Sequence, residues 1–90
     1  MLIKPQFEAG KEQISKGGVV RSAQIHSQVV QHLLEQASRL GLHAHALNFS
    51  PVKGPAGNIE FLVHWKTHET SATIDVSSII DDAHRQLSSL

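Results

Sequence analysis

Apolar side chains recur every three or four positions over residues 22–41, the spacing that places them on one face of an α-helix. The stripe consists of Ile25, Val29, Val30, Leu33, Leu34, Ala37 and Leu40. Ser22 can cap the helix N-terminus, and Gly41 stands where many helices end in a left-handed residue. The pattern therefore predicts a helix between these two residues.

A period of two replaces this spacing over residues 59–66, as expected for a β-strand. One face carries the mainly apolar set Ile59, Phe61, Val63 and Trp65. The other face carries Glu60, Leu62, His64 and Lys66. A second strand is predicted over residues 42–49, and the turn-rich stretch between them is short enough to join the two as an antiparallel pair.

The two ends of the chain carry further elements. Leu2, Ile3 and Phe7 resemble the end of a buried strand, which Pro5 would terminate because it has no N–H to donate. Residues 8–20 are polar and contain a Gly-Gly pair, as expected of a loop. Helical spacing returns in a last segment, with Asp75 as its expected N-cap and an apolar stripe of Val76, Ile79, Ile80, Ala83 and Leu87.

The expected order is thus strand end, helix, strand, strand, helix. A long helix between the first two strands is typical of a parallel crossover. Three strands of this length bury too little apolar surface to form a stable sheet without further elements. The sequence also contains only the end of the first strand. We therefore expect an α/β fold, the C-terminal portion of a Rossmann-like sheet, with residues 1–90 as a single partial domain.

Composition narrows the functional classes. The chain has no cysteine, which excludes a disulfide scaffold and a thiolate metal site. No segment approaches the roughly 20 apolar residues of a membrane span, so we expect a cytoplasmic protein without a membrane partner. Six basic side chains face three acidic ones up to residue 55, and two face five beyond it. A basic first half can bind a phosphate backbone, although ordinary solvated charges give the same pattern.

One pair of residues stands out by its placement. Reactive groups in open α/β sheets gather at the carboxyl ends of the parallel strands, and Lys4 lies at such an end. An antiparallel strand starts at that same edge, so Glu60 can lie beside Lys4. A Lys–Glu pair there can orient a nucleophile and move a proton. The alternative is a surface ion pair or two solvated charges.

Seven histidines raise the question of a metal site. His43 and His45 share a face of the second strand, and His64 can lie across the hairpin from them. No carboxylate is spaced to complete such a set, so we expect no metal. Three further histidines fall on the predicted helices and are expected to be exposed: His26, His32 and His84.

Three segments carry a family resemblance: LIKPQFEAG at residues 2–10, KGGVVR at 16–21 and SPVKGPAGNIEFL at 50–62. Together they resemble the final blocks of the TlyA/hemolysin A family. These are FtsJ-like RNA methyltransferases that use S-adenosylmethionine to methylate a ribose 2′-hydroxyl of ribosomal RNA. The likeness keeps the order and approximate spacing of all three blocks, which makes it specific.

The resemblance implies roles for two residues. The family has a Lys-Asp-Lys-Glu catalytic tetrad, whose second lysine corresponds to Lys4 and whose glutamate corresponds to Glu60. In that case Lys4 takes the proton from the ribose 2′-hydroxyl, and Glu60 positions Lys4 and adjusts its basicity. The other two members, the glycine-rich methyl-donor loop and the S4-type RNA-binding domain have no counterpart in this sequence. We therefore expect a fragment that binds no S-adenosylmethionine and is inactive alone.

Other charged residues are candidates for RNA binding. Lys53, next to the GNIEF block, and Lys16 and Arg21, which flank the Gly-Gly pair, can each contact phosphate. Solvated lysines and a simple turn are the alternatives. A different class of function also stays open: a non-catalytic module that binds RNA, or that forms a homodimer through an exposed sheet edge. A membrane-active toxin is disfavoured, because the chain lacks a strongly basic amphipathic helix.

Overall fold

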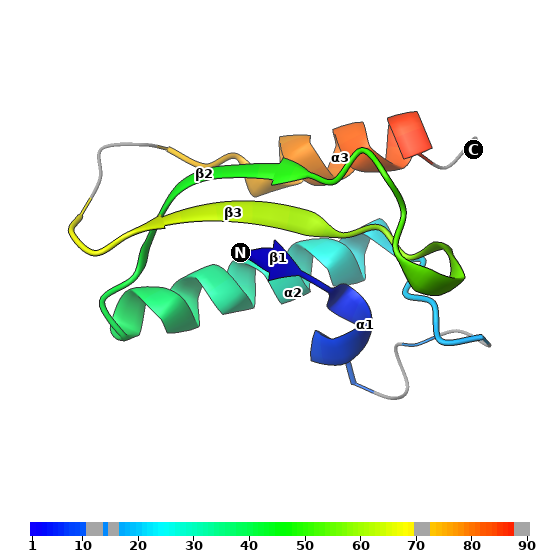
Figure 1. Cartoon of the computed structure of the whole chain (residues 1–90), viewed down its shortest axis with the longest axis horizontal. Helices are drawn as coiled ribbons and strands as arrows, with labels where there is room; N and C mark the ends of the chain where they lie inside the picture. The colour runs from blue at the N-terminus through cyan, green and yellow to red at the C-terminus, as the bar shows by residue number, and fades with distance from the viewer. Residues whose placement is uncertain (11–13, 15–16, 70–72, 88–90) are drawn as a thin grey trace.

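The computed structural model describes residues 1–10, 14, 17–69 and 73–87 of the chain. Its elements are, in order, β1 (Leu2–Ile3), α1 (Pro5–Glu8), α2 (Ala23–Arg39), β2 (His43–Phe49), the 3-10 turn η2 (Pro55–Gly57), β3 (Phe61–Lys66) and α3 (Val76–Leu87). The strands lie side by side, and α2 and α3 run along them (Figure 1). The predicted α/β order is confirmed, with α1 and η2 as additions.

The central strand of the sheet is β3, which is antiparallel to both neighbours in the order β1-β3-β2. Phe49 lies opposite Phe61, and a bulge interrupts the pairing between Ala44 and Ala46. The predicted antiparallel pair is therefore confirmed. β1 and β2 run in the same direction and are joined through α2, as a crossover requires, but β3 lies between them.

Side-chain alternation gives the sheet a covered face and an open face. Phe61 and Val63 point into the core, together with Val30 of α2 and Ile80 of α3. The core cluster consists of Ile3, Val29, Val30, Leu47, Ile59, Phe61, Val63, Val76, Ile80, Ala83 and Leu87. On the open face Leu2 lies opposite Leu62, and these side chains are 40% and 44% exposed.

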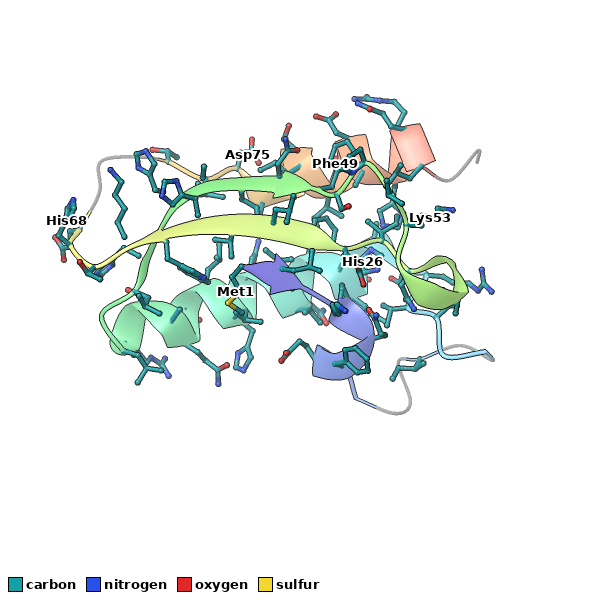
Figure 2. All side chains as sticks on the ribbon, viewed as in Figure 1. Met1, His26, Phe49, Lys53, His68 and Asp75 are labelled. Atoms are coloured by element: carbon teal, nitrogen blue, oxygen red, sulfur yellow. The ribbon has the colours of Figure 1, made fainter. Side chains whose placement is uncertain are left out.

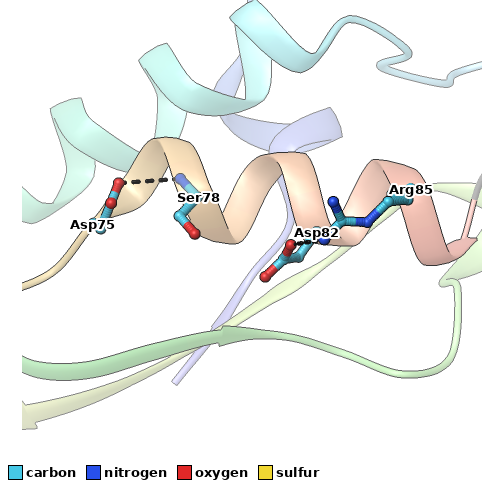
Figure 3. Close-up of polar contacts among 4 residues, drawn as sticks. All are labelled: Asp75, Ser78, Asp82 and Arg85. Carbon is cyan, nitrogen blue, oxygen red and sulfur yellow. Dashed lines mark hydrogen bonds and ion pairs between the residues drawn. The ribbon is translucent and has the colours of Figure 1, made fainter.

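α2 begins and ends as predicted, and α3 begins as predicted. The Ser22 hydroxyl accepts a hydrogen bond from the Ile25 N–H at 3.3 Å, and Gly41 follows α2 with a φ of 86°. The Asp75 carboxylate accepts from the Ser78 N–H at 3.1 Å before α3, as Figure 3 shows. The same figure shows the exposed ion pair of Asp82 and Arg85. No helix within the described ranges is long and apolar enough to cross a bilayer.

The segment after β1 differs from the prediction. The strand ends at Ile3, and Pro5 begins α1 rather than simply ending a strand. Proline suits the first helical position, where the backbone N–H has no partner within the helix. Phe7, expected on a buried strand end, is 75% exposed on this short helix. The chain therefore turns sharply away from the sheet directly after Lys4.

Candidate active site

Segments that are distant in the sequence meet at one end of the sheet (Figure 1). β1 leads directly into Lys4, and Glu60 directly precedes β3. Ile3 pairs with Phe61, so one further step in the same antiparallel register brings Lys4 opposite Glu60. The register thus puts a basic and an acidic residue at one sheet edge.

Lys4 joins β1 to α1 with an extended backbone and a half-buried side chain. Its ammonium nitrogen Nζ lies 6.0 Å from the centroid of the Phe7 ring, at the outer limit of a cation–π contact. Among the described residues, no ion pair joins Lys4 to Glu60. The lysine head therefore rests on a weak, exposed contact that it can leave by side-chain rotation.

Glu60 is only 6% exposed, which is unusual for a carboxylate. Its carboxyl group packs against the backbone of Gly54, where a Cβ atom would fall 2.3 Å from Glu60 Oε2. The Gln6 side-chain amide donates a long hydrogen bond of 3.4 Å to the same oxygen. Burial of a carboxylate costs free energy unless donors or cations surround it. The buried Glu60 carboxylate therefore requires a further hydrogen-bond donor or cation beside it.

The connection between β2 and β3 is folded so that Gly54 can reach Glu60. The Ser50 N–H donates to the Glu60 carbonyl at 2.8 Å, and the Gly54 N–H donates to the Asn58 carbonyl at 2.8 Å. These bonds close the loop and hold its glycine against the carboxylate. Lys53 lies on this loop, half-buried, at the end of the molecule away from His68 (Figure 2).

Asn58 ties a third segment to this end of the sheet. It is 2% exposed, and its Oδ1 accepts from the Val20 N–H at 2.9 Å. Its Nδ2 donates to the Gly18 carbonyl at 2.9 Å. Both ends of the amide are thus used, and a buried polar side chain requires this. As a result, the segment that leads into α2 is fixed beside the Gly54 loop.

The proposed RNA-binding residues fall in different parts of this arrangement. Arg21 is exposed directly after the segment that Asn58 holds, and Lys53 is half-buried on the neighbouring loop. Lys16 lies outside the described residues. Arg21 and Lys53 therefore come from the two segments that the hydrogen bonds of Asn58 hold together.

Sequence reasoning missed Gln6 and Asn58. Neither amide belongs to a periodic pattern, and each acts on a residue at least 38 positions away. The available signal was their position, because Gln6 lies two residues after Lys4 and Asn58 two residues before Glu60. Their closeness to the predicted catalytic pair could have indicated a role for them even without a motif.

Four of the seven histidines form two separate pairs. The rings of His45 and His64 meet edge to face across β2 and β3, with centroids 5.4 Å apart. Nowhere in the described parts of the chain do three or more potential ligands gather as a metal site would require. His26 and His84 join α2 to α3, with 2.7 Å between His26 Nδ1 and His84 Nε2.

The prediction that the helical histidines are exposed is wrong for His26, which is fully buried, and His84 is half-buried. His26 lies one turn before Val29 and Val30 and so shares their core-facing stripe. Burial lowers its pKa to about 4, the neighbouring His84 adds to this, and a backbone hydrogen bond at Val20 opposes it. Burial also lowers the pKa of His84, which Asp81 partly opposes. His32 is exposed as expected.

The Gly17-Gly18 turn is not placed like the glycine-rich loop of a nucleotide-cofactor site. Rossmann-like sheets hold a nucleotide cofactor at a glycine-rich turn between a strand and the helix that follows it. Gly17 and Gly18 both have positive φ, but they lie in a turn followed by Val19 and Val20 rather than directly between strand and helix. We therefore assign none of these residues to a nucleotide-like cofactor.

Comparisons with known proteins converge on one group. The sequence model of the FtsJ-like methyltransferases matches residues 1–67. The 16S/23S rRNA (cytidine-2′-O)-methyltransferase TlyA of Mycobacterium tuberculosis is 37% identical over 97% of this chain and 32% of its own length. Hemolysin A of Brachyspira hyodysenteriae is 38% identical over 71% of this chain and 27% of its own length.

A solved structure agrees with these sequence matches. A candidate hemolysin from Streptococcus thermophilus superimposes with a TM-score of 0.87 at 36% identity, over 98% of this chain and 33% of that one. The chain therefore spans about a third of the length of the relatives that it matches.

Proposed function

The chain belongs to the FtsJ-like methyltransferase family, and on this premise we propose that it supplies Lys4 and Glu60 to the active site of an rRNA ribose 2′-O-methyltransferase. The observation that carries the proposal is the strand register, which extends to bring Lys4 opposite a buried Glu60 carboxylate. A carboxylate as buried as Glu60 is unusual for a solvated surface charge.

Each member of the pair has a distinct task. The Lys4 amine takes the proton of the ribose 2′-hydroxyl, so that the oxygen becomes a better nucleophile. The resulting ammonium is stabilised by the Glu60 carboxylate, which is held nearby by Gly54. S-adenosylmethionine supplies the methyl group in this reaction. Because no donor site is assigned to the described residues, the donor is held outside them.

RNA binding is assigned to cations beside this pair. Arg21 and Lys53 come from the two segments joined through Asn58, and Lys16, which lies outside the described residues, precedes Gly17 in the sequence. Each cation that contacts a phosphate adds affinity that falls with rising salt. The substrate would be ribosomal RNA in the cytoplasm. Arg21→Gln and Lys53→Gln are then expected to weaken RNA binding and to reduce its salt dependence.

The donor assignment predicts a binding result for the isolated chain. The 90-residue chain should bind no S-adenosylmethionine, since the described residues lack the required strand–glycine turn–helix. Isothermal titration calorimetry measures this directly. Tight binding would show that the donor site has been misplaced. In the same account the isolated chain transfers no methyl group.

The catalytic roles are tested in a chimera, in which this chain replaces the matching third of Mycobacterium tuberculosis TlyA. Transfer of a labelled methyl group to ribosomal RNA is measured, and the product nucleoside is identified by mass spectrometry. Lys4→Ala and Glu60→Ala are each expected to lower kcat by about a hundredfold or more. Lys66→Ala, a lysine at the far end of β3, is the matched control.

Two results would count against the proposal. An unmutated chimera that folds but transfers no methyl group would argue against the activity itself. Full activity in both variants would remove Lys4 and Glu60 from the catalytic machinery while leaving the family membership intact.

A second candidate function is self-association. β1 forms one edge of the sheet, and the adjacent Leu2 and Leu62 are 40% and 44% exposed. An open edge with apolar neighbours can pair with a second copy of the chain. Sedimentation equilibrium distinguishes the outcomes: a dimer that Leu2→Lys dissociates supports this function, and a monomer at all concentrations excludes it.

A further inference from the structure

Gln6 carries a polar atom without a partner. Its side-chain nitrogen donates to Glu60 Oε2 at 3.4 Å, whereas its oxygen Oε1 is buried and accepts no hydrogen bond from any residue that the structure describes. A buried acceptor without a donor destabilises the folded state. The Gln6 amide thus has one partner, a proposed catalytic carboxylate, and an oxygen that is unpaired among the described residues. This arrangement indicates that a donor binds the oxygen during catalysis.

Lys4 is a flexible donor close to this oxygen along the chain. It lies two residues before Gln6 and directly follows Ile3, whose strand partner Phe61 directly follows Glu60. Its ammonium carries three N–H donors and no acceptor, and it rests 6.0 Å from the centre of the exposed Phe7 ring. Rotation of the long, flexible lysine side chain exchanges this weak contact for the Gln6 oxygen and the Glu60 carboxylate.

We propose that Gln6 is a positioning residue that links Lys4 to Glu60, with its nitrogen on the carboxylate and its oxygen ready for the lysine. This inference rests on the proposed function. Gln6 itself takes no part in the chemistry. It fixes where the lysine head stands relative to the carboxylate, and an amine held in place removes a proton more effectively than a freely rotating one.

The chemistry of the amide explains why a glutamine suits this position. A primary amide can donate to a carboxylate and accept from an ammonium at the same time. A glutamate at position 6 would set two carboxylates side by side, and a methionine would offer no donor and only a weak acceptor. Gly54 also packs against Glu60, where a Cβ would fall 2.3 Å from Oε2, so the carboxylate is confined beside Gln6.

The kinetic test uses the TlyA chimera. Gln6→Met, which keeps the size of the side chain, is expected to lower kcat by about tenfold to a hundredfold and to leave the KM for ribosomal RNA within about twofold. Gln6→Glu should also lower kcat. The matched control is Gln31→Met, the same change at an exposed position of α2. A kcat of Gln6→Met equal to that of the control, in a chimera that Lys4→Ala inactivates, would overturn the inference and leave the proposed function standing.

A second readout does not depend on activity. The Gln6 side-chain amide signals in a nitrogen–proton NMR spectrum of the chimera, assigned by their loss in Gln6→Met, report both proposed contacts. Glu60→Gln and Lys4→Met are each expected to shift these signals, and Lys66→Met is expected to leave them in place. Both shifts in an inactive chimera would support the link while the proposed function fails. Signals unmoved by Lys4→Met would overturn the link whatever the activity.

Discussion

Gly54 and Glu60 approach each other so closely that the size of one residue decides the position of the other. A Cβ at residue 54 would lie 2.3 Å from one carboxylate oxygen and 2.5 Å from the carboxyl carbon of Glu60. Such distances are far inside van der Waals contact. Glycine is needed here for space, since Gly54 is not among the glycines with positive φ.

Gly54→Ala is therefore expected to push the Glu60 side chain out of its site. Relief of such a clash in a packed region typically costs about 1–3 kcal/mol, measured here as the change in the free energy of unfolding in urea. Methyl transfer by the chimera should fall together with it. In a Glu60→Ala background the same substitution should cost much less, because the clashing group is gone. An equal cost in both backgrounds would contradict the contact.

Asn58 gives a second prediction for a single residue. Asn58→Asp keeps the oxygen that accepts from the Val20 N–H but replaces the donor to the Gly18 carbonyl by a carboxylate oxygen. Two acceptors then face each other in a buried place, and we expect a loss of about 2–3 kcal/mol in the free energy of unfolding at neutral pH. Asn48→Asp, at an exposed position of β2, is the control and should change the free energy of unfolding little. A loss no larger than that of the control would contradict the clamp.

Among the elements, α2 and α3 are joined by a pair of histidines, of which His26 is fully buried and His84 half-buried. His26 is fully buried and also meets the Phe61 ring edge-on, with 5.7 Å between centroids. With 2.7 Å between ring nitrogens, one ring must donate and the other accept. A proton added to His26 would be desolvated and would lie close to His84, which is why its pKa is low.

The free energy of unfolding should therefore decrease as the pH is lowered from about 6.5 to about 4. An unfolded chain takes up a proton at His26 near its ordinary pKa of 6.5, whereas the folded chain does so only at about 4. Stability is thus complete above pH 6.5, declines as the pH falls towards 4 and then levels off for this group. The decline amounts to about 3 kcal/mol, and His84 adds to it in the same direction.

Urea unfolding at a series of pH values tests this expectation. His26→Leu should be destabilised at pH 7, because it breaks the contact with His84, but its profile should be flatter between pH 6.5 and 4. His32→Leu, at an exposed histidine of the same helix, is the control and should keep the slope of the unmutated chain. An unchanged slope in His26→Leu would assign the pH dependence to other groups.

The elements differ in how well the sequence predicted them. The apolar spacing of α2 and the alternation of β3 each repeat often enough to be recognised, and both helices carry cap residues. α1 was missed because four residues hold barely one turn, and Pro5 is compatible both with the end of a strand and with the start of a helix. The burial of His26 was missed although its position one turn before Val29 and Val30 could have indicated it.

For the whole molecule, the strand order decides what the site can be. The antiparallel direction of β3 was enough to predict that Lys4 and Glu60 lie near the same edge of the sheet, whereas the position of β3 between β1 and β2 was not predicted. The contacts of Gln6 and Asn58 could not be predicted, because they depend on how α1 and two loops distant in the sequence pack together. Residue type and strand order are visible in a sequence, whereas loop-to-loop hydrogen bonds are not.

The account as a whole depends on Lys4 and Glu60 acting as one unit. The most direct measurement is a double-mutant cycle on kcat in the TlyA chimera, with Lys4→Met, Glu60→Gln and the two combined. Residues that act as a unit give strongly non-additive losses, so the double variant should be within about twofold of the slower single variant. A loss in the double variant equal to the product of the two single losses would contradict the account.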